Sequence, residues 1–336
     1  MIRTTLLPVL AALTLSLPLP GLAQQPVGQP HSQTPAVQSS QTGIFALLPA
    51  DSVTRHALKT ARRQLPYTAT TGTLDLRGQD GAVSAKVFYT AYVADKGGAD
   101  RPLAFVFNGG PGAASAYLHL GLIGPRILAF GADFSAATMP VLRDNPESWL
   151  DFADLVFIDP VGTGWSRAAS DDKAEAYYGV KQDAEAIAKL IALYVQRNNR
   201  LAAPKYLVGE SYGGFRAAKV AGALKDRQSI VVSGAMMLSP LLDATLNFKA
   251  TDYPLGAALQ LPSLAAAELE RRKMFSPAAV KAAETYAMSD YLIAMAGPPP
   301  EGEAASTLYR KVAQLTGIPV DQVARTRGFV GDLYTR

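Results

Sequence analysis

Short apolar runs alternate with longer helical patterns through the middle of the chain. Four runs end in glycine or polar residues, as strands do: "PLAFVFNGG", "DLVFIDPVGTG", "KYLVGES" and "IVVSGAMMLSP". Apolar residues recur three and four positions apart in 173–198 and 212–226, which predicts two amphipathic helices. Strands that are apolar throughout are typical of a mainly parallel sheet with helices on both faces. The pattern therefore predicts an α/β core over residues 44–243.

The two flanks of this core have different patterns. Residues 44–65 are compatible with a short helix, which would carry His56. The stretches "GTLDLRG" and "AVSAKVFYTAYVA" alternate around a Gln-Asp-Gly turn, which predicts a β-hairpin. Asp243 is expected in a loop or helix cap. Beyond it, Ala-rich helical stretches replace the strands, so residues 244–336 are expected to form an incomplete helical cap or insertion.

Two segments precede the core. Residues 1–23 combine Arg3, an apolar run and small residues before Gln24, which is typical of a secretory signal peptide; an uncleaved membrane anchor is the alternative. Residues 24–43 are rich in Gln, Ser and Pro, which predicts a disordered linker. The chain has no cysteine, so its stability must come from the core rather than from disulfides. We expect a bacterial periplasmic or secreted protein that is free of the membrane after cleavage.

Composition narrows the possible partners. The 32 basic and 28 acidic residues give a formal net charge of +4, and the basic residues are scattered rather than gathered in a stripe. A nucleic acid partner is therefore not expected. The three histidines are isolated along the chain and cysteine is absent, so no metal site is predicted. The pattern says nothing about oligomeric state.

The strongest chemical signal surrounds Ser211. The stretch "GESYG" (209–213) lies between a strand pattern and a helix pattern, which is the context of a nucleophile elbow. Small residues on both sides let a serine adopt a strained turn that exposes its hydroxyl. The glycine-rich loop 108–112 follows another strand, where backbone N–H groups can stabilise an oxyanion, and the amide of Tyr212 is a second donor.

Taken together, these motifs resemble the serine carboxypeptidase family (peptidase family S10). The segments "NGGPG", "DPVGTGWS" and "GESYGG" are similar to that family's signature segments and occur in the same order, and "RDNPESW" is similar to a further one. The resemblance covers about residues 83–243. It implies an α/β-hydrolase fold with a helical insertion, a peptide substrate and no cofactor.

The resemblance also implies roles for individual residues. Ser211 would be the acylated nucleophile, and the amides of Gly110 and Tyr212 would form the oxyanion hole. Asn108 and Glu210 would bind the free C-terminal carboxylate of the peptide. A glutamate donates a hydrogen bond only when it is protonated, so this role favours acidic working conditions. The loop 159–166 would lie beside the site. Its Trp165 could line a side-chain pocket or simply pack, and packing is expected.

The sequence departs from the family in three places, of which the first agrees with a chain that has no disulfides and the second favours a broader peptidase or esterase. Ala113 stands where many members have a cysteine, and Leu122 where some members carry an additional glutamate for carboxylate recognition. The third departure is that no histidine follows Ser211, although the fold requires the order Ser, Asp, His. His119 lies near the glycine loop but is expected to pack rather than to act as the base. We expect that the chain ends before the catalytic Asp and His and before the last two strands.

Three functions remain open from the sequence. The first is a serine-type carboxypeptidase that is incomplete here and therefore has little activity by itself. The second is an esterase or acyltransferase on the same scaffold, in which water or an alcohol resolves the acyl-serine. The third is an inactive remnant in which Ser211 has no catalytic role.

Overall fold

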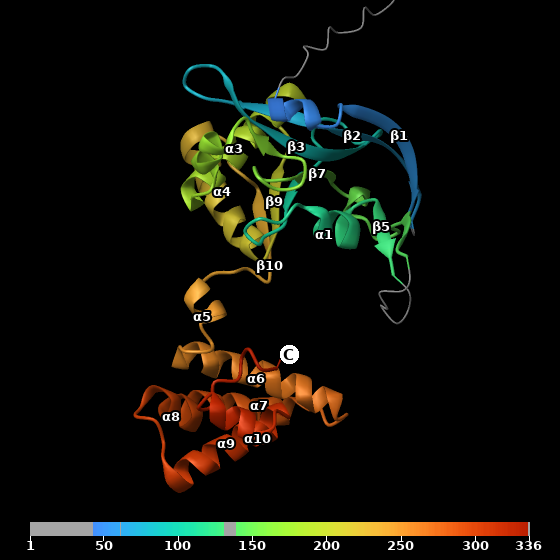
Figure 1. Ribbon diagram of the computed structural model, residues 1–336. Coiled ribbons are helices and arrows are strands. Elements are labelled where there is room, and N and C mark those ends of the chain that lie inside the picture. The colour runs from blue at the N-terminus through green and yellow to red at the C-terminus, as the bar shows by residue number, and fades with distance from the viewer. Residues whose placement is uncertain (1–42, 61, 131–138, 335–336) are drawn as a thin grey trace, which may run out of the picture. The chain divides into compact units, whose positions relative to one another are not determined.

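The computed structural model describes residues 43–60, 62–130 and 139–334. The predicted signal peptide lies outside these residues, as does all of the predicted linker except Gly43. The sheet has the order β1-β2-β3-β7-β4-β9-β10, and β8 pairs with β3 (Figure 1). Its strands are β1 (Ser52–Lys59), β2 (Gln64–Arg77), β3 (Val83–Ala94), β4 (Leu103–Phe107), β7 (Asp154–Ile158), β8 (Arg167–Ala168), β9 (Lys205–Glu210) and β10 (Gly234–Leu238).

The sheet is mixed, and its parallel half consists of the four strands that the apolar runs predict. Of these, β10 is not buried as predicted, because its residues are exposed or half-exposed. Strands β7, β4, β9 and β10 pair in parallel, whereas β1, β2, β3 and β7 pair antiparallel. β4 and β7 are buried at every position, as their continuous apolar runs predict. The predicted hairpin is confirmed as β2 and β3, joined through residues 78–82. The α/β fold class is therefore confirmed.

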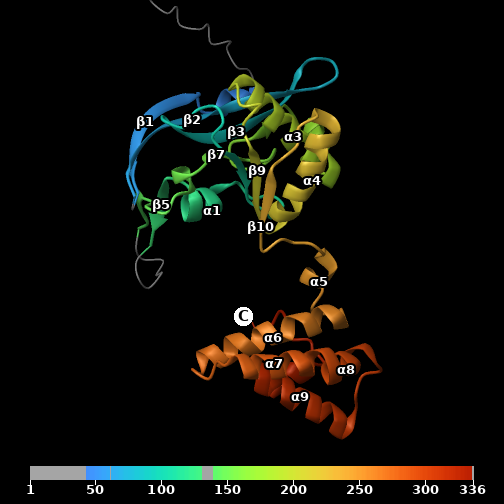
Figure 2. The ribbon, with the colours of Figure 1, turned by 180° about the vertical axis from the view of Figure 1, so that it is seen from behind.

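Helices cover both faces of the sheet (Figures 1 and 2). The long helices α3 (Val180–Arg197) and α4 (Tyr212–Gln228) pack on one face through residues such as Ile187 and Val220. The opposite face is covered by α1 (Ala116–Leu118), the π-helical turn His119–Ile123 and the 3-10 helix Trp149–Asp151. The short helix α2 (Asp171–Ala174) and the 3-10 helix Glu175–Tyr177 precede α3.

The structure corrects two sequence expectations. Residues 44–65 contain a 3-10 helix only over Gly43–Leu47, and the rest forms β1, which carries His56. The reason is tertiary, because β1 pairs along its whole length with β2, and this pairing outweighs a weak local helix pattern. The sequence also does not predict the hairpin of β5 (Arg126–Ala129) and β6 (Val141–Asp144).

The described residues from 244 onward contain helices and no strand, as predicted. Asp243 caps the first helix, because its Oδ1 accepts from the amides of Thr245 and Leu246 at 2.8 and 3.3 Å, which confirms the expected cap. Leu261, Tyr291 and Val312 form the centre of a separate core. The helices are α5 (Ala244–Phe248), α6 (Pro254–Arg271), α7 (Pro277–Tyr286), the π-helix Ala287–Tyr291, α8 (Leu292–Ala296), α9 (Gly302–Thr316) and α10 (Val320–Arg325).

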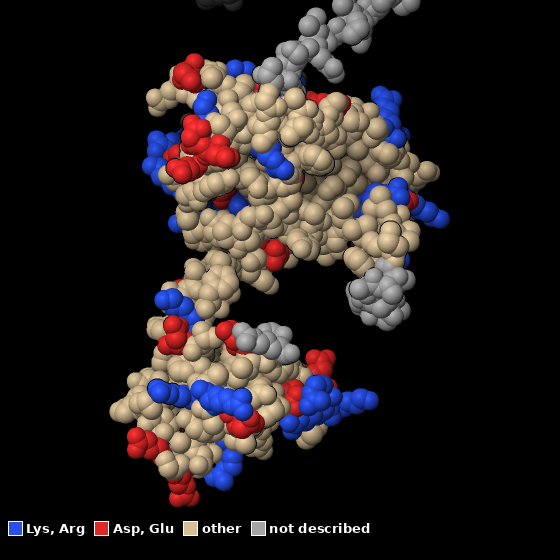
Figure 3. Space-filling model, viewed as in Figure 1, with Lys and Arg blue, Asp and Glu red and all other residues tan. Residues whose placement is uncertain are grey.

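The surface agrees with the scattered charge of the sequence. On the face shown in Figure 3, acidic and basic side chains are interspersed among uncharged ones in each part of the molecule, without a continuous basic stripe. Of the helices in the described ranges, none combines the length and apolar character that crossing a membrane requires.

Candidate active site

Three sequence motifs begin at the carboxyl ends of three neighbouring parallel strands. Asn108 follows β4, Asp159 follows β7, and Ser211 follows β9. Parallel strands β7, β4 and β9 are adjacent in the sheet, so these residues lie along one edge. In α/β proteins this is the edge where ligands bind. The sheet therefore assembles residues that are about a hundred positions apart in the sequence.

Ser211 adopts the strained backbone of a sharp strand-to-helix turn. Its φ of 58° and ψ of −124° lie in a region that non-glycine residues seldom occupy. Hydrogen bonds fix this conformation: the Ser211 amide donates to the Leu238 carbonyl at 2.9 Å, and the Ser211 carbonyl accepts from the amides of Gly214 and Leu241, each at 3.0 Å. The side chain makes no capping hydrogen bond and is partly exposed.

Glycines allow the strand, the helix and the neighbouring loop to meet closely at this turn. A Cβ atom on Gly209 would overlap the Gly213 carbonyl, and a Cβ on Gly213 would lie 2.5 Å from the Phe107 carbonyl oxygen. A Cβ on Gly109 would lie 2.6 Å from the Tyr212 amide nitrogen. The loop that begins at Asn108 is therefore packed directly against the backbone of the turn.

The same loop has backbone angles that glycine makes possible. Gly110 and Gly112 have φ values of 101° and 106°. These values explain why the segment needs glycine at both positions. Gly110 is exposed, whereas Gly109 is buried against the serine turn.

Asn108 and Glu210 are brought together, as the proposed shared role requires. The Asn108 Nδ2 donates to Glu210 Oε2 at 3.2 Å, and Asn108 Oδ1 accepts from the Leu118 amide at 3.0 Å. Asn108 is fully buried, while Glu210 is partly exposed. The two contacts fix which end of the Asn108 amide faces Glu210.

The loop 159–166 is held by its own hydrogen bonds. Asp159 Oδ1 accepts from the Ser115 amide at 2.9 Å, and Ser166 Oγ donates to the Asp159 carbonyl at 2.5 Å. Burial raises the pKa of Asp159, while the amides of Ser115 and Trp165 oppose that rise. The expectation that Trp165 packs is wrong, because 51% of this residue is exposed.

A cavity of about 330 Å³ confirms that this loop lies beside the serine turn. Its walls include Gly112 of the glycine loop, Gly162 of the second loop and Tyr212 next to the candidate nucleophile. Two further tyrosines, Tyr177 and Tyr178, also line it. The cavity therefore connects all three sequence motifs.

His119 is not placed as a base for Ser211. Its Nε2 is 2.6 Å from the Tyr92 hydroxyl, and its ring stacks on Phe157 with the ring centroids 4.4 Å apart. Burial lowers the pKa of His119 to about 4, so the ring is neutral near pH 7. His56 lies on β1 and stacks on Tyr67. Within the described ranges, no histidine is hydrogen-bonded to Ser211.

Sequence reasoning missed Arg216 and Asp183, which also line the cavity. Their side chains form an ion pair, with Arg216 Nε 2.7 Å from Asp183 Oδ2. The sequence signal that could have indicated Arg216 is its position as an arginine within the largely apolar pattern of residues 212–224. Its partner is not evident from the sequence, because the two residues lie on different helices. The described part of the chain contains no cluster of three or more His, Asp or Glu side chains suited to a metal.

These features define an α/β-hydrolase scaffold: a strained serine between strand and helix, at the carboxyl edge of parallel strands and against a glycine loop. A family model described as "Serine carboxypeptidase" matches residues 62–272. This match covers more than half of the chain, so the protein belongs to the serine carboxypeptidase family.

Individual relatives match over shorter stretches. The pheromone-processing carboxypeptidase kex1 of Sclerotinia sclerotiorum is 34% identical over 122 residues, which are 36% of this chain and 18% of that protein. Serine carboxypeptidase-like 36 of Arabidopsis thaliana is 27% identical over 219 residues, which are 62% of this chain and 43% of that protein. The chain thus spans less than half the length of both relatives.

A solved structure is also similar. The prohormone-processing carboxypeptidase Kex1Δp of Saccharomyces cerevisiae aligns with a TM-score of 0.43 and 19% identity, over 71% of this chain and 55% of that one.

Proposed function

We propose that the protein is a serine-type carboxypeptidase that forms an acyl intermediate on Ser211. The observation that carries this proposal is the strained Ser211 turn packed against the Asn108 loop, with the Asn108–Glu210 pair beside it. The Ser211 hydroxyl attacks the last peptide carbonyl, the C-terminal amino acid leaves, and water then hydrolyses the acyl-serine. The amides of Gly110 and Tyr212 stabilise the oxyanion in both steps.

The Asn108–Glu210 pair gives the specificity for a free C-terminus. One hydrogen of the Asn108 side-chain amide is donated to Glu210, which leaves the second hydrogen for the substrate carboxylate. Glu210 donates to that carboxylate only when it is protonated. An activity maximum well above about pH 8 would contradict this role.

The proposal places the protein outside the cytoplasm of a bacterium, in the periplasm or secreted. The support is the signal-peptide pattern of residues 1–23, with cleavage expected near Ala23. N-terminal sequencing of the protein recovered from the native host tests this. A mature N-terminus close to Gln24 is the expected result, and an intact Met1 in a membrane fraction contradicts it.

The first experiment measures binding and acylation separately on the 336-residue chain. Two peptides that differ only at the C-terminus, one with a free carboxylate and one with an amide, are titrated by calorimetry. We expect at least about tenfold tighter binding of the acid, because the amide leaves the Asn108–Glu210 pair without its charged partner. Asn108→Leu should remove this preference, and equal binding of both peptides to the wild type would contradict the proposed role.

Acylation is followed with a fluorophosphonate probe and peptide mapping. We expect labelling at Ser211 that is lost in Ser211→Ala. In the part of the chain described here Ser211 has no histidine partner, so the rate should be low, with the oxyanion hole and binding as the remaining sources of catalysis. Turnover of simple esters without any preference for free carboxylates would favour the esterase alternative. Absence of labelling would favour an inactive protein.

A further inference from the structure

Arg216 is a buried cation next to the candidate nucleophile. It lies on α4 five residues after Ser211, and only 3% of it is exposed. The proposed reaction gives it no role, because it is neither a triad member nor an oxyanion donor. A buried guanidinium is costly unless it is paired and hydrogen-bonded, so its contacts indicate what it does.

The guanidinium of Arg216 contacts both the glycine loop and the serine turn. Its Nη1 donates to the backbone carbonyl of Asn108 at 2.6 Å. Its Cζ lies 4.9 Å from the ring centroid of Tyr212, within the range of a cation–π contact. One side chain therefore holds the residue that begins the glycine loop and the residue that follows the nucleophile.

A third contact fixes the guanidinium itself. Arg216 Nε donates to Asp183 Oδ2 at 2.7 Å. Asp183 lies in the first turn of α3, and its side chain is 14% exposed. Burial raises the pKa of Asp183, and Arg216 opposes that rise. Because a guanidinium is planar and its donors point in fixed directions, two hydrogen bonds determine its orientation. Lysine carries the same charge but lacks this fork.

We propose that Arg216 is a positioning residue of the acyl-transfer site, which fixes the Asn108 loop and Tyr212 relative to Ser211, and that Asp183 holds Arg216 in place. The inference rests on the proposed function. It adds a requirement that is not evident from the sequence motifs. The oxyanion donors keep their geometry only while the buried Arg216–Asp183 ion pair is intact.

The chain offers a matched control for this pair. Arg227 and Glu185 also join α4 to α3, with Arg227 Nε 3.1 Å from Glu185 Oε1, but their side chains are 58% and 37% exposed. Arg227→Met breaks an ion pair between the same two helices without contacting the site. Comparison of Arg216→Met, Arg216→Lys and Arg227→Met separates positioning from helix packing.

The first readout is the rate of Ser211 labelling by a fluorophosphonate, at a temperature where all variants are folded. We expect Arg216→Met to slow labelling about 100-fold, the usual consequence of a displaced catalytic group. The Arg216→Lys variant should still be labelled at least about tenfold more slowly than the wild type, because lysine lacks the forked donors of the guanidinium. Arg227→Met should stay within about twofold of the wild type. Wild-type rates in Arg216→Met would overturn the proposal.

The second readout is hydrogen exchange followed by mass spectrometry, which does not depend on activity. We expect Arg216→Met to increase exchange at the amides of 109–113 and 211–214 while β2 and β3 keep their protection. A uniform increase across the sheet would show a purely structural role and overturn the proposal. If the wild type is never labelled, the proposed function fails, and this exchange pattern alone decides whether Arg216 positions the loop.

Discussion

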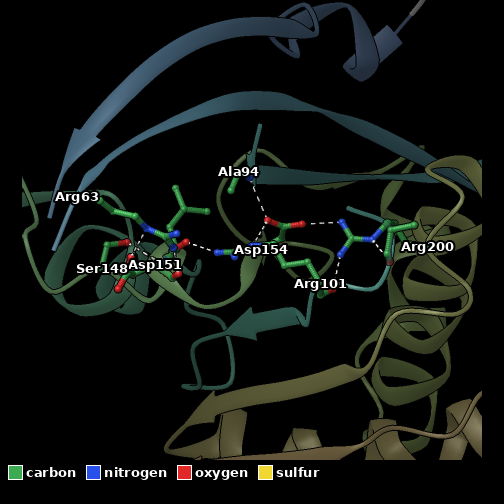
Figure 4. A network of polar contacts seen from close by, with 9 residues as sticks. Arg63, Ala94, Arg101, Ser148, Asp151, Asp154 and Arg200 are labelled. Atoms are coloured by element: carbon green, nitrogen blue, oxygen red, sulfur yellow. Dashed lines mark hydrogen bonds and ion pairs between the residues drawn. The ribbon is translucent and has the colours of Figure 1, made fainter. Parts of the chain in front are cut away.

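At the amino ends of the parallel strands, polar groups converge on one buried carboxylate, whereas the carboxyl ends hold a strained serine, glycine loops and a cavity. Asp154, the first residue of β7, is 1% exposed and accepts hydrogen bonds through both of its carboxylate oxygens (Figure 4). Its Oδ1 accepts from the Ala94 amide and from Arg101 Nε, each at 3.0 Å, and its Oδ2 accepts from Arg200 Nη1 at 2.6 Å.

The two ends use arginine for different purposes. At the amino ends, two arginines share Asp154 and also donate to carbonyls of the surrounding loops, for example Arg200 Nη2 to the Arg101 carbonyl at 2.5 Å. At the carboxyl ends, Arg216 pairs with one carboxylate and orients backbone and ring atoms beside Ser211. The difference is that the amino ends surround a fully paired carboxylate, whereas the carboxyl ends hold a strained backbone beside a partly exposed serine.

The largest effect should come from removing the carboxylate at the amino ends. Asp154→Ala leaves Arg101 and Arg200 largely buried without their shared partner, and we expect a loss of about 3–5 kcal/mol in the free energy of unfolding. Denaturant unfolding measures it. Asp321→Ala, which breaks an exposed pair with Arg325, should cost at most about 1 kcal/mol. Similar losses in both variants would refute the anchoring role of Asp154.

A second prediction concerns the close packing at the serine turn. Gly209→Ala places a methyl group against the Gly213 carbonyl, which is backbone and cannot rotate away. We expect a loss of about 1–3 kcal/mol and loss of Ser211 labelling. Gly222→Ala on α4 meets no atom within 4 Å and should stabilise by up to about 1 kcal/mol. Retained labelling in Gly209→Ala would show that the turn can relax.

Backbone strain at Ser211 gives a smaller effect of the opposite sign. Ser211→Gly can adopt the observed positive φ without strain, whereas Ser211→Ala cannot. Both variants remove the hydroxyl, so both lose labelling, but the glycine variant should be more stable by about 1 kcal/mol. Thermal unfolding of the two proteins side by side measures this difference. Equal stability would mean that the turn stores no strain.

The smallest effect should be a pH dependence at Asp159. Burial raises the pKa of Asp159 in the folded protein above that of the same carboxyl in the unfolded chain. The protonated side chain therefore favours the folded state fully at pH values below the unfolded-chain pKa. This stabilisation is lost as the pH rises through the folded-state pKa. Asp159→Asn keeps an acceptor for the Ser115 amide but removes the charge. Its stability relative to wild type should therefore be higher near about pH 7 than near about pH 3.5.

Asp226→Asn, on the exposed side of α4, controls for the removal of one negative charge. If Asp159→Asn behaves in the same way as Asp226→Asn in denaturant titrations at both pH values, burial of Asp159 has no energetic consequence.

Local patterns along the chain determined much of the scaffold and the core of the candidate site. Continuous apolar runs correctly indicated β4 and β7, because a strand covered on both faces must be apolar at every position. The apolar run of β10 instead forms an exposed strand at the end of the sheet order. The "GESYG" stretch between strand and helix placed Ser211 at the turn, because only small neighbours permit that backbone. The loop at Asn108 and the cap at Asp243 followed from the same local reasoning.

Only the tertiary structure decided the remaining features. Residues 52–59 form a strand because β2 offers a partner along their whole length. Trp165 is 51% exposed although its large apolar ring favoured packing, and only the fold of its loop decides this. Arg216 meets Asp183 and the Asn108 carbonyl only when α3, α4 and β4 are packed together. The hydrophobic periodicity of a sequence indicates which face of a helix or strand is buried, but it does not indicate which distant residue a buried charge contacts.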